Sequence, residues 1–295
     1  MQVPAQFRYE KAVSVEHALT LLGRYGPESR VVAGGHSLIP MMKLRLAQPE
    51  ALIDINDLHE LAIISVERHV LCIGALTRHA DLLSSALVGE HFPIFHDAER
   101  VIADPVVRNR GTVGGSLCQA DPSEDLSAAF AAVRGEAVIV SPEGRRTVPV
   151  REFFLGPYQT VVDPGELLVQ LRVPIRSSAS AYQKVERRAG DWAVAAAGAE
   201  LVLDDGVVAD AGIGLAALGA PNFHAREAES FLVGGPATDE RFAEAARIAA
   251  EHCNPIADQR GPEEYKRHLA KTLVTRVLSV ARTRWHGLHS GEKAR

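Results

Sequence analysis

Two short glycine-rich segments restrict the folds that this chain can adopt. Each ends an apolar stretch and combines a glycine pair with hydroxyl-bearing residues: Ala33-Gly34-Gly35-His36-Ser37 in the first and Thr112-Val113-Gly114-Gly115-Ser116 in the second. Glycine tolerates positive φ and has no Cβ, so successive backbone N–H groups can converge on a closely approaching anion. Hydrogen bonds to a charged oxygen contribute about 1.5–3 kcal/mol each. Either segment alone is typical of a turn, whereas the two together favour a pyrophosphate site.

The common nucleotide-binding and hydrolase motifs are missing from the sequence. Gly212-Ile213-Gly214 lacks the third glycine of G-x-G-x-x-G and lies in a strand-like pattern. There is no G-x-x-x-x-G-K-[ST] phosphate loop and no G-x-S-x-G nucleophile elbow. Any dinucleotide site in this chain is therefore expected to be of a non-Rossmann kind.

Composition and charge favour an ordinary globular protein. Of the 295 residues, 46% are hydrophobic and 23% are charged, and the formal net charge is −5. No run of Lys and Arg exceeds two residues, so we expect no nucleic-acid partner. The first residues lack the basic and apolar regions of a secretory signal, and no apolar run reaches the roughly 18 residues of a membrane span.

The cysteines and histidines do not form a metal-binding pattern. Cys72, Cys118 and Cys253 lie far apart without a C-x-x-C pair, which fits a reducing cytoplasm and offers no iron–sulfur or zinc framework. His91 and His96 are five residues apart and do not share a helix face. We expect no metal site and a cytoplasmic location, with any contact to the inner face of the membrane made through partners.

The N-terminal half alternates between strand-like and helix-like patterns. Ser14 and Ser123 are suited to cap helices, and Glu67-Arg68-His69 is typical of a hairpin turn. Pro40–Leu46 is expected to anchor the first glycine segment in the core, and a loop is expected from Asp104 to the second. The expected helices are 15–22, 77–103 with a break at Pro93, and 123–133, and the expected strands are 30–33, 51–55, 63–66, 70–73, 137–140 and 166–173.

The C-terminal half has three long strand patterns followed by three amphipathic helices. Asp204-Asp205-Gly206 is a strong hairpin signal, and Pro262 suits the first turn of the last helix. Residues 174–180 resemble a linker between domains, and residues 287–295 are expected to be disordered. The expected strands are 181–186, 193–203 and 207–218, and the expected helices are 226–232, 239–252 and 262–284.

The segments AGGHSLIPMMKLRL and RNRGTVGGSLCQADPSEDLSA resemble the FAD-binding medium subunit of molybdenum hydroxylases, the family of aerobic carbon monoxide dehydrogenase and of the flavin domain of xanthine dehydrogenase. The likeness extends through GELLVQLRVP, KVERRAGDWA and EYKRHLAKTLVTRVL and covers nearly the whole chain. It implies an α+β fold. Residues 1–176 would form a two-part FAD-binding domain of the PCMH/vanillyl-alcohol-oxidase-like type, with subdomains of residues 1–57 and 58–176. Residues 177–286 would form a three-stranded antiparallel sheet packed on a three-helix bundle.

The resemblance also implies which residues contact the cofactor. Asp125 aligns with an acidic residue near FAD, and Lys184 with a basic one. From the sequence alone, Asp125 is equally a helix-start carboxylate and Lys184 an exposed strand lysine. The residues matching the two pyrophosphate loops are Ala33, Gly34, Gly35, His36, Ser37, Leu38, Thr112, Val113, Gly114, Gly115 and Ser116.

Three further positions follow from the same resemblance. Leu168 matches an apolar position against the flavin or adenine. Asp191-Trp192 occupies a place where relatives carry Asp followed by a smaller aromatic residue. Trp192 either shields one face of the flavin or only packs.

The function implied by the resemblance is electron transfer rather than substrate binding. FAD would take electrons from [2Fe–2S] clusters of a small subunit, fed by a large molybdopterin subunit, and pass them to quinone, NAD⁺ or oxygen. The family assembles as a dimer of heterotrimers, and no side chain of this chain would be catalytic. Two alternatives remain: a self-contained flavin oxidoreductase, and a non-redox nucleotide-binding or assembly module.

Overall fold

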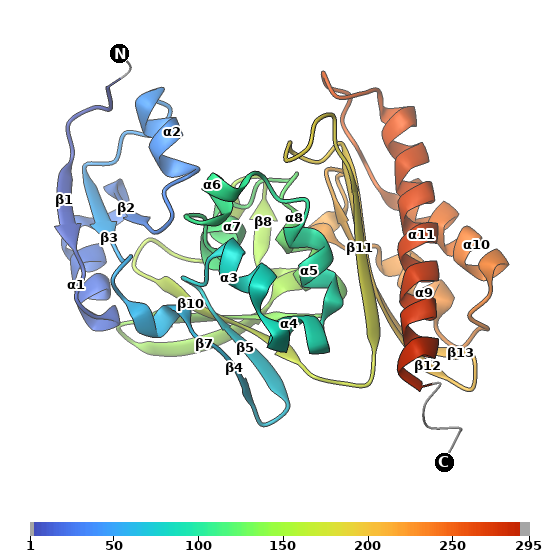
Figure 1. Ribbon diagram of the computed structural model, residues 1–295. Coiled ribbons are helices and arrows are strands. Elements are labelled where there is room, and N and C mark those ends of the chain that lie inside the picture. Colours follow the sequence, from blue (N-terminus) through green and yellow to red (C-terminus); the bar gives the residue numbers. More distant parts are fainter. Residues whose placement is uncertain (1–2, 290–295) are drawn as a thin grey trace.

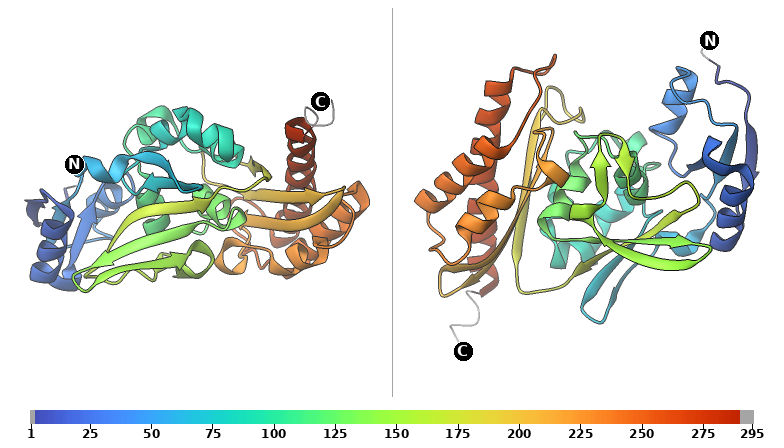
Figure 2. Two further views of the ribbon diagram at one scale, coloured as in Figure 1. Left: turned by 90° about the horizontal axis from the view of Figure 1, so that it is seen from below. Right: turned by 180° about the vertical axis from the view of Figure 1, so that it is seen from behind.

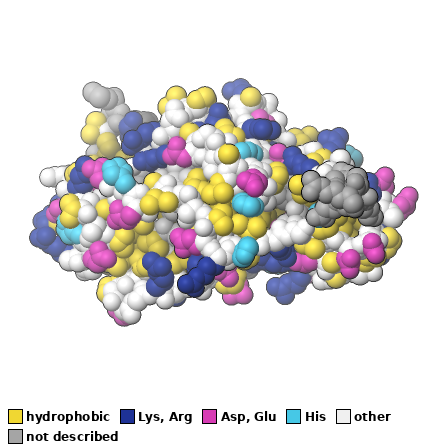
Figure 3. Space-filling model, turned by 60° about the horizontal axis from the view of Figure 1, so that its bottom comes forward, with side chains coloured by type: hydrophobic (Ala, Val, Ile, Leu, Met, Phe, Trp, Pro, Cys, Tyr) yellow, Lys and Arg dark blue, Asp and Glu magenta, His cyan; other side chains and the backbone are white. Residues whose placement is uncertain are grey.

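The computed structural model describes residues 3–289 as an α+β chain arranged in successive layers. A small sheet lies at one end, a five-stranded sheet with several helices forms the middle, and a second three-stranded sheet with long helices forms the other end (Figure 1). Acidic and basic side chains are interspersed over the face shown in Figure 3. No helix among the described residues combines the length and apolarity needed to cross a membrane.

The first sheet is parallel and has the order β1-β3-β2. Helix α1 (Val15–Tyr25) covers it, and Ser14 caps this helix by accepting a hydrogen bond from the His17 N–H, as predicted. The sequence did not predict β1, because three of the four residues in RYEK are charged and the strand is mostly exposed. The strands are β1 (Arg8–Lys11), β2 (Ser29–Val32) and β3 (Ala51–Asp54).

Helix α2 (Leu38–Lys43) follows the first glycine segment and anchors it only in part. Met42 is buried against Val32 and Leu52, as expected for a core residue. Leu44 and Leu46 are 54% and 73% exposed, so the prediction that the anchor extends to residue 46 is wrong. The reason is that the helix ends at Lys43 and Arg45 adopts a φ of 58°, which redirects the chain.

The central sheet has the order β4-β5-β10-β6-β7 and is antiparallel throughout. The predicted first hairpin is present, and Arg68 and His69 adopt the positive φ of a tight turn. Strand β7, at the other edge of the central sheet, was not predicted because GRRTVP is polar and mostly exposed. The strands are β4 (Ile64–Glu67), β5 (Val70–Gly74), β6 (Glu136–Ser141), β7 (Gly144–Pro149) and β10 (Leu167–Pro174), with the small pair β8 (Phe154–Gly156) and β9 (Gln159–Thr160) beside it.

Short helices cover the central sheet, and two of them replace the expected loop between residues 104 and 116. Asp104 Oδ1 accepts a hydrogen bond from the Val107 N–H at 2.8 Å, and Thr112 Oγ1 accepts one from the Gly115 N–H at 3.1 Å. These caps begin helices in a region that polar and glycine residues made look irregular. The helices are α3 (His79–Ser84), α4 (Ala86–His91), α5 (Pro93–Glu99), α6 (Pro105–Arg108) and α7 (Val113–Gln119).

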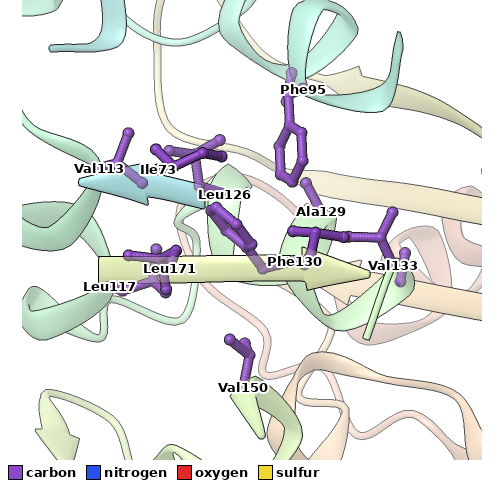
Figure 4. Packing of buried hydrophobic residues seen from close by; sticks show 14 of the residues in the cluster. Ile73, Phe95, Val113, Leu117, Leu126, Ala129, Phe130, Val133, Val150 and Leu171 are labelled. Carbon is purple, nitrogen blue, oxygen red and sulfur yellow. The ribbon is translucent and has the colours of Figure 1, made fainter. Parts of the chain in front are cut away.

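Helix α8 (Asp125–Ala132) lies wholly buried at the centre of the molecule. Leu126, Ala129 and Phe130 pack against Phe95 and neighbouring core residues (Figure 4). The predicted cap, Ser123, is wrong: Glu124 is the N-cap, and its carboxylate accepts from the N–H groups of Leu126 and Ser127. The Glu124 carboxylate accepts from two N–H groups of the first turn that have no partner within the helix, which explains why Glu124 and not Ser123 is the N-cap.

The second three-stranded sheet is sandwiched between helices. Its order is β11-β12-β13, with one face against α5 and α8 and the other against α9 and α11, on which α10 packs (Figure 2). The hairpin at residues 204–206 is confirmed. The elements are β11 (Ala179–Val185), β12 (Ala195–Asp204), β13 (Val207–Ala216), α9 (Arg226–Leu232), α10 (Asp239–His252) and α11 (Glu263–His289).

Helix α11 is longer than predicted. Residues 287–289, expected to be disordered, continue the helix, while residues 290–295 lie outside the described part of the chain. The Trp285 ring stacks on His289 with centroids 4.1 Å apart, and Ser177 hydrogen-bonds to His289 Nε2. These contacts extend the helix beyond the last turn that the apolar pattern indicates.

Replacing Gly214 by alanine should destabilise the contact between α8 and β13. A Cβ at this position would overlap the Ala128 carbonyl oxygen, so we expect a loss of about 1–3 kcal/mol or more. Gly165→Ala is the matched control, because its Cβ would meet no atom within 4 Å. Urea unfolding of both variants measures the difference, and equal midpoints would contradict the close contact.

Candidate functional site

The first glycine segment leaves consecutive backbone donors unused. It runs from the end of β2 to the start of α2, and Gly35 adopts a φ of 78°, which favours glycine. Among residues 3–289, none accepts a hydrogen bond from the N–H groups of Gly35, His36 or Ser37. His36 and Ser37 are exposed, so these three N–H groups are free to bind an anion.

The two glycine segments lie in direct contact. A Cβ on Gly34 would overlap the Arg110 carbonyl oxygen and would come within 2.8 Å of the Gly111 Cα. Arg110 and Gly111 lead directly into the second segment. The missing side chain of Gly34 is therefore what allows the two backbones to pack side by side.

The side chains of Asn56 and Arg78 connect the two glycine segments. Neither residue was predicted from the sequence. Asn56 Nδ2 donates to the Ala33 carbonyl oxygen at 2.7 Å, and Asn56 Oδ1 accepts from Arg78 Nη2 at 2.7 Å. The Arg78 guanidinium also donates to the Arg110 carbonyl oxygen. Asn56 follows β3, the parallel neighbour of β2, so the carboxyl ends of the two strands lie at one edge and place it beside Ala33. A polar residue directly after this strand was the available sequence signal.

The second segment differs from the first in its backbone. The N–H groups of Val113, Gly114 and Gly115 donate to Thr77 O, Ala75 O and Thr112 Oγ1. A Cβ on Gly114 would lie 2.6 Å from that of Ala75, so this glycine permits close packing. The expected convergence of free N–H groups therefore applies to the first segment only. The second contributes the half-buried Ser116 hydroxyl and the exposed Gly115 backbone, whereas Thr112 is 2% exposed and its hydroxyl caps α7.

The Ser116 hydroxyl is part of a chain of polar groups that reaches the core. Its Oγ lies 3.0 Å from His79 Nε2, and His79 Nδ1 lies 2.9 Å from Glu99 Oε1. His79 and Glu99 are both buried. Burial alone would lower the pKa of His79, but the Glu99 carboxylate reverses this and raises it. Neither His79 nor Glu99 was singled out from the sequence.

Asp125 and Lys184 form a buried ion pair. The Lys184 side chain is 1% exposed, and its Nζ donates to Asp125 Oδ2 and to the Val101 carbonyl oxygen, both at 2.9 Å. Tyr182 donates its hydroxyl to Asp125 Oδ1 at 2.8 Å. Burial raises the pKa of Asp125, and Lys184 opposes that rise. Lys184 is not an exposed strand lysine, whereas Asp125 does stand in the first turn of α8.

The remaining predicted residues have different surroundings. Val113 and Leu168 are core residues, and Leu38 is half-buried against Met42 and its neighbours. Asp191 and Trp192 lie on the loop between β11 and β12, where the Trp192 side chain is 44% exposed. The same loop contacts the segment between α5 and α6: a Cβ on Gly190 would lie 2.7 Å from the Ala103 carbonyl oxygen.

A hollow of about 770 Å³ lies away from both glycine segments, and none of their residues line it. It is bounded by α1 and by the central sheet, and Glu16, Glu60 and Glu67 line it. Three carboxylates disfavour a diphosphate there. Among residues 3–289, no group of three or more His, Cys, Asp and Glu side chains is arranged to hold a metal ion.

The two glycine segments, in contact at Gly34 and with three free N–H groups, form a candidate site for an anion. Residues 5–176 match the family described as FAD binding domain in molybdopterin dehydrogenase. Residues 180–281 match the family described as CO dehydrogenase flavoprotein C-terminal domain. The chain belongs to the FAD-binding medium subunits of molybdenum hydroxylases.

Individual relatives resemble the chain over nearly its full length. It is 41% identical to the carbon monoxide dehydrogenase medium chain of Hydrogenophaga pseudoflava, covering 95% of this chain and 98% of that protein. It is 36% identical to the glyceraldehyde dehydrogenase medium chain of Sulfolobus acidocaldarius, covering 93% and 98%. A solved structure of the Hydrogenophaga carbon monoxide dehydrogenase superposes with a TM-score of 0.92 at 42% identity, covering 96% and 99%. The chain is thus an FAD-containing oxidoreductase subunit, as the sequence predicted.

Proposed function

We propose that this chain carries electrons from [2Fe–2S] clusters of a partner subunit to an external acceptor such as quinone, NAD⁺ or oxygen. The bound FAD supplies the one- and two-electron redox chemistry. Membership of the medium-subunit family supports this role. The partners are a small iron–sulfur subunit and a large molybdopterin subunit in a dimer of heterotrimers, located in the cytoplasm.

The FAD diphosphate is held between the two glycine segments. The observation that carries this assignment is the contact of Gly34 with Arg110 and Gly111, which brings three free N–H groups close to the segment that holds the Ser116 hydroxyl. The group fits these residues because a doubly charged diphosphate needs several donors and close backbone approach. His36, Leu38, Asp191 and Trp192 extend the site toward the rest of the cofactor, and the buried Asp125, Leu168 and Lys184 bound it from the core.

The domain organisation follows the same assignment. Residues 1–176 form the FAD-binding domain of the PCMH/vanillyl-alcohol-oxidase-like type, with a small part to about residue 57, and residues 177–286 form the C-terminal domain. A parallel sheet beside an antiparallel five-stranded sheet supports the two-part description. The oxidised substrate is selected on the large subunit, which agrees with relatives named for substrates as different as carbon monoxide and glyceraldehyde.

The test compares the isolated chain with the assembled complex. The purified chain should bind one FAD and show the visible absorption of an oxidised flavin. Its flavin should be reduced rapidly by the substrate only when both partner subunits are present. Rapid turnover of small reductants by the isolated chain would favour a self-contained flavin oxidoreductase, and failure to bind FAD would favour a non-redox module.

Loss of the bridge between the segments should weaken FAD binding without unfolding the protein. Asn56→Ala removes the hydrogen bonds to Ala33 and Arg78, and we expect the FAD dissociation constant to rise about tenfold, since each bond contributes about 0.5–1.5 kcal/mol. Flavin fluorescence quenching measures the constant. Gln48→Ala is a control, because Gln48 is exposed and bonds only to the nearby Arg45 carbonyl oxygen. Equal affinity in both variants would contradict a role for the bridge.

A further inference from the structure

A continuous set of hydrogen-bonded groups connects the protein core to the second glycine segment. Glu99 of α5 and His79 of α3 are buried, whereas Ser116 of α7 is half-buried and belongs to the segment itself. The contact distances are 2.9 Å from Glu99 Oε1 to His79 Nδ1 and 3.0 Å from His79 Nε2 to Ser116 Oγ. The position of one proton in this set decides which way the serine hydroxyl points.

The hydrogen-bonding roles have two solutions. The Glu99 carboxylate accepts from Nδ1–H, which fixes that side of the imidazole. In neutral His79, Nε2 carries a lone pair and accepts the hydroxyl proton of Ser116, which then points into the core. In cationic His79, Nε2–H donates to Ser116 Oγ, and the hydroxyl proton is free to point outward. Only the second state lets Ser116 donate to a bound anion.

We propose that His79, held by Glu99, is a positioning residue that turns the Ser116 hydroxyl toward the FAD diphosphate, and that FAD binding is coupled to uptake of a proton by His79. This inference rests on the proposed location of the diphosphate between the two glycine segments. The anion favours the cationic state in two ways: it accepts the outward hydroxyl proton and it attracts the nearby positive charge.

Other charged groups around His79 set its protonation. Glu99 acts from α5, and Glu124 and Asp125 act from the start of α8, all in the direction that raises the pKa of His79. Asp125 is paired with Lys184. Burial raises the pKa of Glu99, whereas His79 and Arg108 of α6 act to lower it. Burial raises the pKa of Glu124 itself to about 7. From α3 and α4 the titratable residues are Asp81, Glu90 and His91; Asp81 and Glu90 are exposed and His91 is half-buried.

The sign of the coupling follows from the raised pKa. The folded protein favours cationic His79 at lower pH, and this form is lost as the pH rises through the raised value. FAD affinity should therefore be greatest on the acidic side and should fall by up to about tenfold per pH unit above the pKa of the FAD-free protein. The decline should level off above the pKa of the FAD-bound protein, where His79 is neutral in both.

The test is calorimetric titration of the FAD-free full chain with FAD in two buffers of different ionisation enthalpy. The titrations cover about pH 5.5–9, a range that includes the usual histidine pKa. We expect a buffer-dependent enthalpy that reports proton uptake by the wild type. His79→Gln keeps a donor toward Ser116 but cannot titrate, so it should bind FAD within about threefold of the wild-type optimum and show no such uptake. Ser116→Ala should take up less proton than the wild type, because only the charge attraction remains, and should bind FAD less tightly at low pH.

Glu124→Gln separates the two titratable candidates, because it removes the carboxyl group whose pKa is about 7 and leaves His79 in place. Proton uptake should persist in this variant. Uptake that persists in His79→Gln, or equal enthalpies in both buffers for the wild type, would overturn the coupling. These results require that FAD binds, so they differ from failure of the proposed function, in which FAD would not bind at all. Thermal unfolding of each variant verifies that it is folded.

Discussion

Gly34→Ala is expected to lower FAD affinity by roughly 10²–10⁴-fold. The added Cβ would overlap the Arg110 carbonyl oxygen and press on Gly111, both of them backbone, so the two glycine segments must separate. Separation moves the free N–H groups of the first segment away from the hydroxyls of the second. Loss of two hydrogen bonds to the charged diphosphate, at about 1.5–3 kcal/mol each, gives this range.

Gly23→Ala is the matched control for this substitution. Gly23 lies exposed in α1, and its Cβ would meet no atom within 4 Å. It should bind FAD as the wild type does and gain about 0.5–1 kcal/mol of helix stability. Flavin fluorescence quenching gives both dissociation constants, and wild-type affinity in Gly34→Ala would show that the segments need not touch.

Asp125→Ala should be the most destabilising single charge removal at the site. It leaves the Lys184 ammonium, 1% exposed, without its carboxylate partner, and it removes the acceptor for the Tyr182 hydroxyl. Breaking a buried ion pair from one side costs about 3–5 kcal/mol, because the other charge stays desolvated. Urea unfolding should show a midpoint well below that of the wild type.

The double variant Asp125→Ala/Lys184→Met distinguishes the lost partner from the lost volume. Removing both charges should recover part of the stability, since no uncompensated charge remains. Lys11→Met is the exposed counterpart: Lys11 and Asp57 are 50% and 56% exposed, and its loss should leave the urea midpoint close to that of the wild type. A double variant no more stable than Asp125→Ala would contradict the charge argument.

The sequence predicted most of the regular elements because their signals are local. Ser14 caps α1, the turns at residues 67–69 and 204–206 have the positive φ that their residues suggest, and Pro93 begins α5. Sequence-based prediction failed where a contact with a segment distant in the sequence determines the local structure. Strand β1 forms from charged sequence because β3 supplies a parallel partner.

The candidate site was predicted in part for the same reason. Both glycine segments were visible as local patterns, and the structure brings them together at Gly34. The bridge through Asn56 and Arg78 and the buried His79 were not visible, since their partners lie 20 or more residues away. Such contacts depend on strand order and helix packing, which no local pattern specifies.

The two segments also look alike in sequence but differ in structure. The first follows a parallel strand and leaves its N–H groups free, whereas the second starts α7 against the central sheet and uses them internally. Hydroxyl groups therefore matter more in the second segment. For this reason our proposal assigns the contact of the second segment with FAD to the Ser116 hydroxyl and its orientation to His79.

A crystal structure of the FAD-loaded chain tests the central claim most directly. We predict that the diphosphate lies between the two glycine segments, within hydrogen-bond distance of the Gly35, His36 or Ser37 N–H groups and of the Ser116 hydroxyl. A diphosphate bound elsewhere, such as in the acidic hollow between α1 and the central sheet, would contradict the account.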